Sequence, residues 1–239
     1  MEMDMYDPAS STDTAPGDDA GGSAHYYTRD FWSQENLKFV KPHFRMEKAA
    51  RIINAMAQGK ESCLLDVGCG PATLMRLLDE NIHYYGIDIA IHEPAPNLIE
   101  ADFLKTPIKF GDNRFDIVLA QGVFEYVGSF QTQKLDEISK LLTSNGKFIV
   151  SYWNFNHRDK QGTPAFSNIQ SYSQLRKSLA CYFTIDNSFP IGHNWHQREP
   201  GRKLMKAAQM GVNINIPFIS PVLAVEYFFI CSPCRSKRA

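Results

Sequence analysis

The sequence predicts an α/β fold built on a doubly wound, mostly parallel sheet. Between residues 63 and 152, short apolar runs of strand length alternate with amphipathic stretches of helical period. The first apolar run, Cys63 to Val67, ends directly in a glycine turn, which is typical of a buried strand that leads into a helix. Ligands of such sheets bind beyond the carboxyl ends of the strands, so the residues at those ends are the candidate site.

Length and composition bound the domain organisation. A chain of 239 residues with 44% hydrophobic residues suits one large domain, which we place at residues 25–239. Residues 1–24 contain six acidic residues and no Lys or Arg, and this composition predicts a disordered acidic tail. The rest of the chain has only a mild basic excess, which argues against a nucleic-acid binder.

The cysteines and the hydropathy pattern indicate the compartment. Five cysteines, an odd number, favour a reducing, cytoplasmic location. No apolar run is long enough to span a bilayer, and the N-terminus lacks the pattern of a signal peptide, so we expect no membrane association. Cys231 and Cys234 have metal-ligand spacing, but no second pair and no clustered histidine accompanies them. We therefore expect no metal site.

The hydrophobic periodicity predicts the order of the elements. Helices are expected at 34–40, 45–58, 72–80, 132–142 and 171–180. Strands are expected at 63–67, 83–88, 97–100, 115–120, 147–152, 182–189 and 222–230, with a turn at Asn145–Gly146 before the fifth. The aromatic-rich N-terminal segment, residues 25–60, is expected either to pack as ordinary helices or to form a lid over a pocket.

The turn after the first strand carries residues suited to a ligand that has an anionic group and a cationic or hydroxyl-bearing part. Gly68 and Gly70 lack a Cβ atom, so the backbone there can turn sharply and lie against a ligand. Pro71 suits the first position of the expected helix, whose free N–H groups favour an anionic group. Asp66, at the end of the strand, is an acceptor for a cationic or hydroxyl-bearing part of the same ligand.

Acidic side chains also follow the next two strands. Asp88 lies 20 residues beyond the first glycine of the turn, a spacing that in a βαβ unit places a carboxylate beside the ribose of a nucleoside. Asp102 stands next to Phe103, where it can accept from an exocyclic amine while its apolar neighbours enclose a purine. Together with Asp66 and Gln121, these acids predict four polar groups at one edge of the sheet.

These residues resemble the motifs of the class I S-adenosylmethionine-dependent methyltransferases. The resemblance covers residues 45–152 well and residues 171–230 in outline. It implies a Rossmann-like methyltransferase fold, in which the sheet has seven strands, the last two form an antiparallel hairpin, and an insertion separates them. It also implies S-adenosylmethionine as the methyl donor. The donor site that it implies comprises Tyr27, Asp66, Gly68, Cys69, Gly70, Asp88, Ile89, Asp102, Phe103, Gln121 and Gly122.

The same resemblance assigns parts of the donor to these residues. Asp66 and the glycine turn look like the loop that binds the methionine moiety. Asp88 looks like the acid that binds the ribose, and Asp102 looks like the acid that binds the adenine. Gln121 and Gly122 border the methyl group in this resemblance.

One departure from the family concerns the turn after the fourth strand. Many relatives have Glu-His there, and this chain has Glu125-Tyr126, so a histidine base is absent at that position. The remaining catalytic candidates are His157, His193 and His196 as bases and Tyr126 as a positioning donor. No spacing selects among them.

A long insertion between the last two strands is the expected acceptor site. Residues 190–221 are rich in basic and histidine side chains, and they form either a solvated surface or a cap over the acceptor. As a cap they would contact the acceptor through His193 and Arg198. Trp32 and Trp153 complete the expected substrate contacts.

The sequence therefore predicts methyl transfer from S-adenosylmethionine to an oxygen or nitrogen atom of a small biosynthetic molecule. The basic insertion suggests that this molecule carries a phosphate or a carboxylate. One alternative is an RNA or nucleoside methyltransferase, which the near-neutral charge disfavours. The other is a non-catalytic S-adenosylmethionine-binding partner protein, which the complete set of acidic and glycine positions disfavours.

Overall fold

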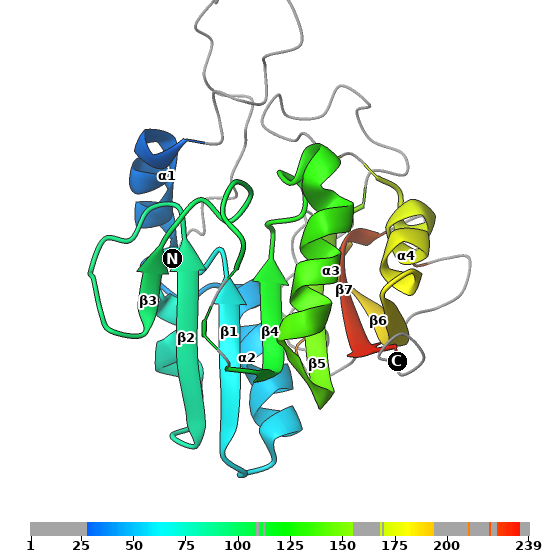
Figure 1. Cartoon of the computed structure of the whole chain (residues 1–239), viewed down its shortest axis with the longest axis horizontal. Coiled ribbons are helices and arrows are strands. Elements are labelled where there is room, and N and C mark those ends of the chain that lie inside the picture. The colour runs from blue at the N-terminus through cyan, green and yellow to red at the C-terminus, as the bar shows by residue number, and fades with distance from the viewer. Residues whose placement is uncertain are drawn as a thin grey trace, which may run out of the picture.

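Seven strands form one sheet in the order β3-β2-β1-β4-β5-β7-β6 (Figure 1). The computed structural model describes residues 28–108, 110–111, 113–154, 168, 170–193, 210, 220 and 224–234. The strands are β1 (Ser62–Val67), β2 (Ile82–Asp88), β3 (Leu98–Glu100), β4 (Phe115–Gln121), β5 (Leu142–Trp153), β6 (Phe183–His193) and β7 (Ala224–Pro233).

Four α-helices and three short 3₁₀ helices accompany the sheet within the described residues. The α-helices are α1 (Arg29–Glu35), α2 (Phe44–Ala57), α3 (Gln131–Leu141) and α4 (Tyr172–Ala180). The 3₁₀ helices are η1 (Asn36–Phe39), η2 (Thr73–Leu77) and η3 (Gly128–Phe130). Among these helices, none has the length and apolar character needed to cross a membrane.

The pairing of the strands confirms the predicted fold class. Strands β3, β2, β1, β4 and β5 pair in parallel, whereas β7 is antiparallel to both β5 and β6. The sheet is therefore doubly wound and mostly parallel, with an antiparallel hairpin at its end. The order of the strands reverses between β1 and β4: β2 and β3 follow on one side of β1, and β4 and β5 lie on the other. Such switch points leave a crevice at the carboxyl ends of the strands.

Alternate residues of the central strands bury the two faces of the sheet. Leu65 of β1 packs in a cluster with Leu135 of α3 and Leu179 of α4. Its neighbour Leu64 points to the other face, where it packs in a cluster with Ile53 of α2. In Figure 1, α3 and α4 accordingly lie in front of the sheet and α2 lies behind it. Because both faces are covered, the strands read as continuous apolar runs in the sequence.

One predicted helix is wrong in type and extent. The segment expected as a helix over residues 72–80 forms only η2, because Ala72 adopts a left-handed conformation with φ of 52° and Leu78 is extended. The side chain of Asn54 in α2 donates to the carbonyl of Leu77 and accepts from the N–H of Asp79, which holds the segment in this shape. A five-residue 3₁₀ helix supplies no regular helix N-terminus, so the anion-binding argument from that helix does not apply.

The predicted turn at Asn145–Gly146 lies within β5 rather than before it, because β5 already begins at Leu142. The pairing of β5 with β4 shifts register between Phe115 and Ile117. At Gly146 a Cβ atom would lie 2.9 Å from the carbonyl oxygen of Phe115. Residues 143–146 therefore lie opposite a single residue of β4, and the glycine permits the close approach of the two backbones at this irregularity.

The insertion between the last two strands begins later than predicted. β6 continues through His193 and β7 starts at Ala224, so residues 190–193 are part of the sheet. Most of residues 194–223, with His196 and Arg198, lie outside the described residues. The predictions for the tail at 1–24 and for Tyr27 and His157 also fall outside them.

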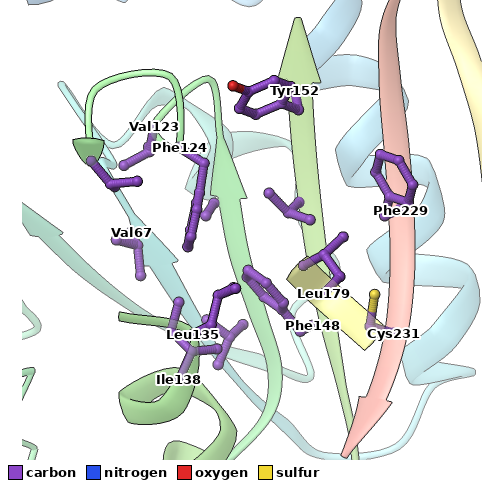
Figure 2. Packing of buried hydrophobic residues seen from close by; sticks show 14 of the residues in the cluster. Val67, Val123, Phe124, Leu135, Ile138, Phe148, Tyr152, Leu179, Phe229 and Cys231 are labelled. Atoms are coloured by element: carbon purple, nitrogen blue, oxygen red, sulfur yellow. The ribbon is translucent and has the colours of Figure 1, made fainter. Parts of the chain in front are cut away.

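Phe148 tests the packing that holds this sheet. Its buried ring lies within the cluster drawn in Figure 2, 5.9 Å from the ring of Phe124 and 5.2 Å from that of Phe183. We expect Phe148→Ala to lower the free energy of unfolding by about 3–5 kcal/mol, measured by urea denaturation. The matched control Phe130→Ala changes a half-exposed ring and should cost less than about 1 kcal/mol. Equal losses in the two variants would contradict this assignment of the core.

Candidate active site

A cavity of about 270 Å³ lies at the carboxyl edge of the sheet, beyond the ends of the neighbouring strands β1 and β4. Its floor comes from the ends of the strands and the turns that follow them, and its walls come from the N-terminal helices. The sheet side contributes Asp66, Gly68, Cys69, Gly70, Asp88, Ile89, Phe103, Gln121, Gly122, Glu125, Tyr126 and Trp153. The N-terminal side contributes Phe31, Trp32, Asn36, His43 and Arg45 among others.

The turn after β1 has a backbone that only glycine tolerates. Gly68 has a φ of 75°, and a Cβ atom on it would lie 2.4 Å from Cγ2 of Val123. The N–H groups of Gly68 and Cys69 both donate to the carbonyl of Ile87 in β2, at 2.8 and 3.2 Å. The turn is therefore fixed against the neighbouring strand, and its bare backbone borders the cavity.

Asp88, at the end of β2, joins three segments of the site. Its Oδ2 accepts from the N–H of Gly70 at 2.8 Å, and its Oδ1 accepts from the N–H of Ala90 at 2.9 Å and from Nδ2 of Asn36 at 3.2 Å. The backbone N–H of Ile89 also interacts with this carboxylate, so four donors surround it. Burial raises the pKa of Asp88, and the hydrogen bonds from Ala90, Gly70, Asn36 and Ile89 oppose that rise.

Asp66 is the most strongly perturbed acid of the strand ends. It is buried, and its Oδ2 accepts from the hydroxyl of Tyr84 at 2.8 Å. Burial raises the pKa of Asp66 to about 7, and the neighbouring carboxylate of Asp88 adds to the rise. A cationic ligand group beside Asp66 would favour the ionised carboxylate and lower this pKa again.

Asp102 lies apart from the cavity, whereas its neighbour Phe103 lines it. The Oδ1 of Asp102 accepts from the backbone N–H of Leu104 at 3.1 Å, and Nζ of Lys105 lies 3.0 Å from its Oδ2. In this arrangement the carboxylate caps its own turn. Its predicted role at the adenine remains a prediction.

The N-terminal helices close the cavity from the side opposite the strand ends. Asn36, in η1, is buried and donates through its amide to Asp88 and to the carbonyl of Ala90. Trp32, in α1, packs edge-on against Tyr126 with 5.3 Å between the ring centroids. The described part of the N-terminal segment forms helices that line the cavity, and both expectations for this segment, ordinary packing and a lid, remain predictions. Asn36 carried no motif that would have identified it.

A cluster of charged side chains borders the cavity beside the end of β4. Arg45 of α2 forms an ion pair with Glu226 of β7 at 2.9 Å, and Glu125 lies close enough for its pKa to respond to both. The backbone carbonyl of Arg45 also accepts from the side chain of Gln121 at 3.1 Å. In the sequence, Glu125 stands out only as the residue before Tyr126, which departs from the family motif. Arg45 and Glu226 are 181 residues apart, so no local pattern could have paired them.

The structure brings most of the described predicted residues together. Trp32, Tyr126 and Trp153 line the same cavity as the predicted donor residues. Strand β6 ends at His193 on the carboxyl edge of the sheet, opposite Ala224 of β7. The positions of the remaining histidine candidates lie outside the described residues.

Comparison with known proteins identifies the family. A family model described as "Methyltransferase domain" matches residues 42–202. The chain belongs to this methyltransferase family. The predicted resemblance to the S-adenosylmethionine-dependent methyltransferases is thereby confirmed, and with it the prediction of S-adenosylmethionine as the donor.

Individual relatives of this methyltransferase are distant. It is 32% identical over 108 residues to an uncharacterized protein of Methanocaldococcus jannaschii, a match that covers 44% of this chain and 46% of that protein. A TehB-like SAM-dependent methyltransferase from Corynebacterium glutamicum has a similar structure, with a TM-score of 0.57, 14% identity, and 88% of this chain and 99% of that chain covered. The N-methyltransferase NodS of Bradyrhizobium japonicum, solved with S-adenosyl-L-homocysteine, gives a TM-score of 0.53, 10% identity, and coverage of 84% and 98%. These two structures share the fold with this methyltransferase.

The residues around the cavity fit S-adenosylmethionine. The turn at Gly68 and Gly70 lines the cavity, and a Cβ atom at these positions would press on Val123 or Asn36 in the same wall. Asp66 offers a carboxylate for the ammonium group of the donor, and the carboxylate of Asp88 lines the cavity as the candidate acceptor for a ribose hydroxyl. When bound, the donor supplies a methyl group on a positively charged sulfur atom.

Asp88→Ala tests the assignment of the ribose. A hydrogen bond to a charged acceptor contributes about 1.5–3 kcal/mol, so we expect this variant to bind S-adenosylhomocysteine about tenfold more weakly or worse in calorimetric titration. Asp136→Ala, on the exposed face of α3, is the matched control and should bind like the parent. Unchanged affinity in a folded Asp88→Ala protein would remove Asp88 from the ribose site.

The pH dependence of donor binding tests Asp66. With a pKa of about 7, Asp66 is mostly protonated at pH 6 and mostly ionised at pH 8. Because the ionised form attracts the ammonium of the ligand, the affinity for S-adenosylhomocysteine should rise about tenfold between these pH values. Asp66→Asn should bind weakly at both and lose this rise. A rise that persists in Asp66→Asn would assign the titration to another group.

Proposed function

We propose that this protein transfers the methyl group of S-adenosylmethionine to a nitrogen or oxygen atom of a small molecule. One observation carries the proposal. The glycine turn after β1, the carboxylate of Asp88 and the end of β4 at Gly122 border one cavity, which the N-terminal helices cover. The donor and the acceptor atom can therefore meet in a space shielded from water.

The chain's main contribution to such a reaction is alignment. The methyl group is already electrophilic, so the residues need to hold the acceptor's lone pair in line with it. Gly122 has a φ of 69°, and a Cβ atom on it would lie 2.7 Å from a guanidinium nitrogen of Arg45. Arg45 therefore lies beside the end of β4, where the resemblance places the methyl group, and its carbonyl accepts from the side chain of Gln121. Trp32 and Tyr126 form the adjacent wall of the cavity.

Two features support an anionic group on the acceptor. The insertion predicted at 190–221 is rich in basic residues, and it follows β6, which ends at the same edge of the sheet. Within the cavity wall, Nε of Arg45 is buried without a hydrogen-bond partner. A carboxylate or phosphate would satisfy this donor. We propose that Arg45 and the insertion, including His196 and Arg198, bind that group.

The cavity favours a small acceptor over RNA. At about 270 Å³, it lies just below the range of roughly 300–1,000 Å³ that is usual for small-molecule sites. The near-neutral charge of the chain also disfavours a nucleic-acid substrate. The cavity extends beyond the donor residues to Trp153, which leaves space for an acceptor. A non-catalytic binding protein does not need such space, so the cavity does not support that alternative.

Turnover with labelled donor tests the proposed function. We expect the protein to form S-adenosylhomocysteine and to transfer the labelled methyl group to the low-molecular-weight fraction of a cell extract. Gly68→Ala should abolish this transfer because of the clash with Val123. Gly59→Ala is the matched control, since it has a similar φ of 71° but nothing within 4 Å of the added Cβ atom. Transfer to the RNA fraction, or no product above the donor-alone background, would contradict the proposal.

A further inference from the structure

Glu125 is a buried carboxylate with one oxygen atom left unpaired beside the cavity. Its side chain is 3% exposed and lines the cavity. Oε1 accepts from the backbone N–H of Trp153 at 2.8 Å, whereas Oε2 is buried without a hydrogen-bond partner. Leaving such an atom unpaired is costly. Oε2 is therefore poised to accept from a group that enters the cavity.

The charges around Glu125 indicate the sign of that group. Arg45 is the neighbouring cation, and it is already paired with Glu226 at 2.9 Å. Tyr152 of β5 also interacts with Glu125, but its hydroxyl supplies no positive charge. When Glu125 is ionised, this set of four side chains carries one negative charge in excess. Burial and the repulsion from Glu226 accordingly raise the pKa of Glu125 to about 7. A positively charged N–H donor would complete the cluster.

The adjacent wall suits the same kind of group. Aromatic side chains of Phe31, Trp32, Tyr126 and Trp153 line the cavity together with Glu125. Aromatic rings attract ammonium groups through their π-electron density, most strongly where water is excluded. A carboxylate at the floor and aromatic rings at the side are complementary to a protonated amine rather than to a neutral hydroxyl.

We propose that Glu125 binds the protonated amine of the methyl acceptor and removes its proton. This inference rests on the proposed function and narrows it from nitrogen or oxygen to nitrogen. The N–H bond of the ammonium breaks, and the proton forms an O–H bond with Oε2 of Glu125. The electron pair of the broken bond stays on nitrogen as the lone pair that methyl transfer requires. The carboxylic acid of Glu125 returns the proton to solvent when the site opens.

This role makes Glu125 the candidate base. Glu125 belongs to the turn directly after β4, next to the Gln121–Gly122 segment that the resemblance places at the methyl group. A carboxylate with a pKa near 7 can accept a proton at neutral pH and release it again. Tyr126, the adjacent residue, packs against Trp32 and so helps to hold the turn in place.

The test uses benzylamine and benzyl alcohol as a pair of probes that differ in the charged nitrogen. Both are titrated at pH 8 into the full chain saturated with S-adenosylhomocysteine, and binding is followed by NMR. We expect the parent to bind benzylamine at least about tenfold more tightly than benzyl alcohol. Glu125→Gln keeps the shape of the side chain and should lose this preference. Glu61→Gln, an exposed carboxylate at the opposite end of β1, is the matched control and should keep it.

Each outcome bears on a separate statement. If the parent does not bind S-adenosylhomocysteine, the proposed function fails before the amine site is reached. If the parent binds S-adenosylhomocysteine but shows no preference for benzylamine, the inference about Glu125 is overturned. This result comes from the parent protein alone, so it does not depend on whether a variant folds. An equal preference in parent and Glu125→Gln overturns it as well. Glu125→Gln could instead weaken the binding of S-adenosylmethionine more than that of S-adenosylhomocysteine, whose sulfur is uncharged. In that case Glu125 interacts with the sulfonium of the donor, and its assignment to the amine is wrong.

Discussion

The carboxylate of Asp88 is the interaction on which the rest of the site depends. It accepts one hydrogen bond from the turn after β1, one from the turn after β2 and one from the N-terminal helices. Each donor is a backbone N–H or an amide with few alternative partners. Removing this acceptor would leave the N–H of Gly70 and the amide of Asn36 without their common partner, and buried polar groups without partners are costly. The shape of the donor cavity is thus tied to a single side chain.

This arrangement links the N-terminal helices to the occupant of the cavity. Other contacts that hold these helices are weaker or more peripheral. The ion pair of Arg29 with Glu100 is exposed, and such pairs contribute about 0–1 kcal/mol. The hydroxyl of Thr73 donates to the carbonyl of Phe39 at 2.7 Å, which anchors the end of η1. Asn36 therefore provides the contact through which a ribose at Asp88 would affect these helices.

The sequence predicted the floor of the site because that floor obeys a simple geometric rule. Strand ends of a parallel sheet lie along one edge, so Asp66, Asp88 and Gln121 could be grouped without knowledge of the fold's details. The walls obey no such rule. Asn36 reaches Asp88 across 52 residues, and Arg45 reaches Glu226 of the last strand, so these contacts depend on tertiary packing. The prediction of a helix over residues 72–80 was wrong because it also ignored a tertiary contact. The side chain of Asn54 in α2 bonds to the backbone of Leu77 and Asp79.

Hydrogen exchange with and without S-adenosylhomocysteine tests most directly whether Asp88 couples the donor to the N-terminal helices. The account predicts that the ligand slows exchange at the amides of residues 36–39, of Gly70 and of Ala90 together. The β6–β7 hairpin, away from Asp88, should exchange at an unchanged rate. Slowed exchange at Gly70 and Ala90 with no change at residues 36–39 would contradict the coupling.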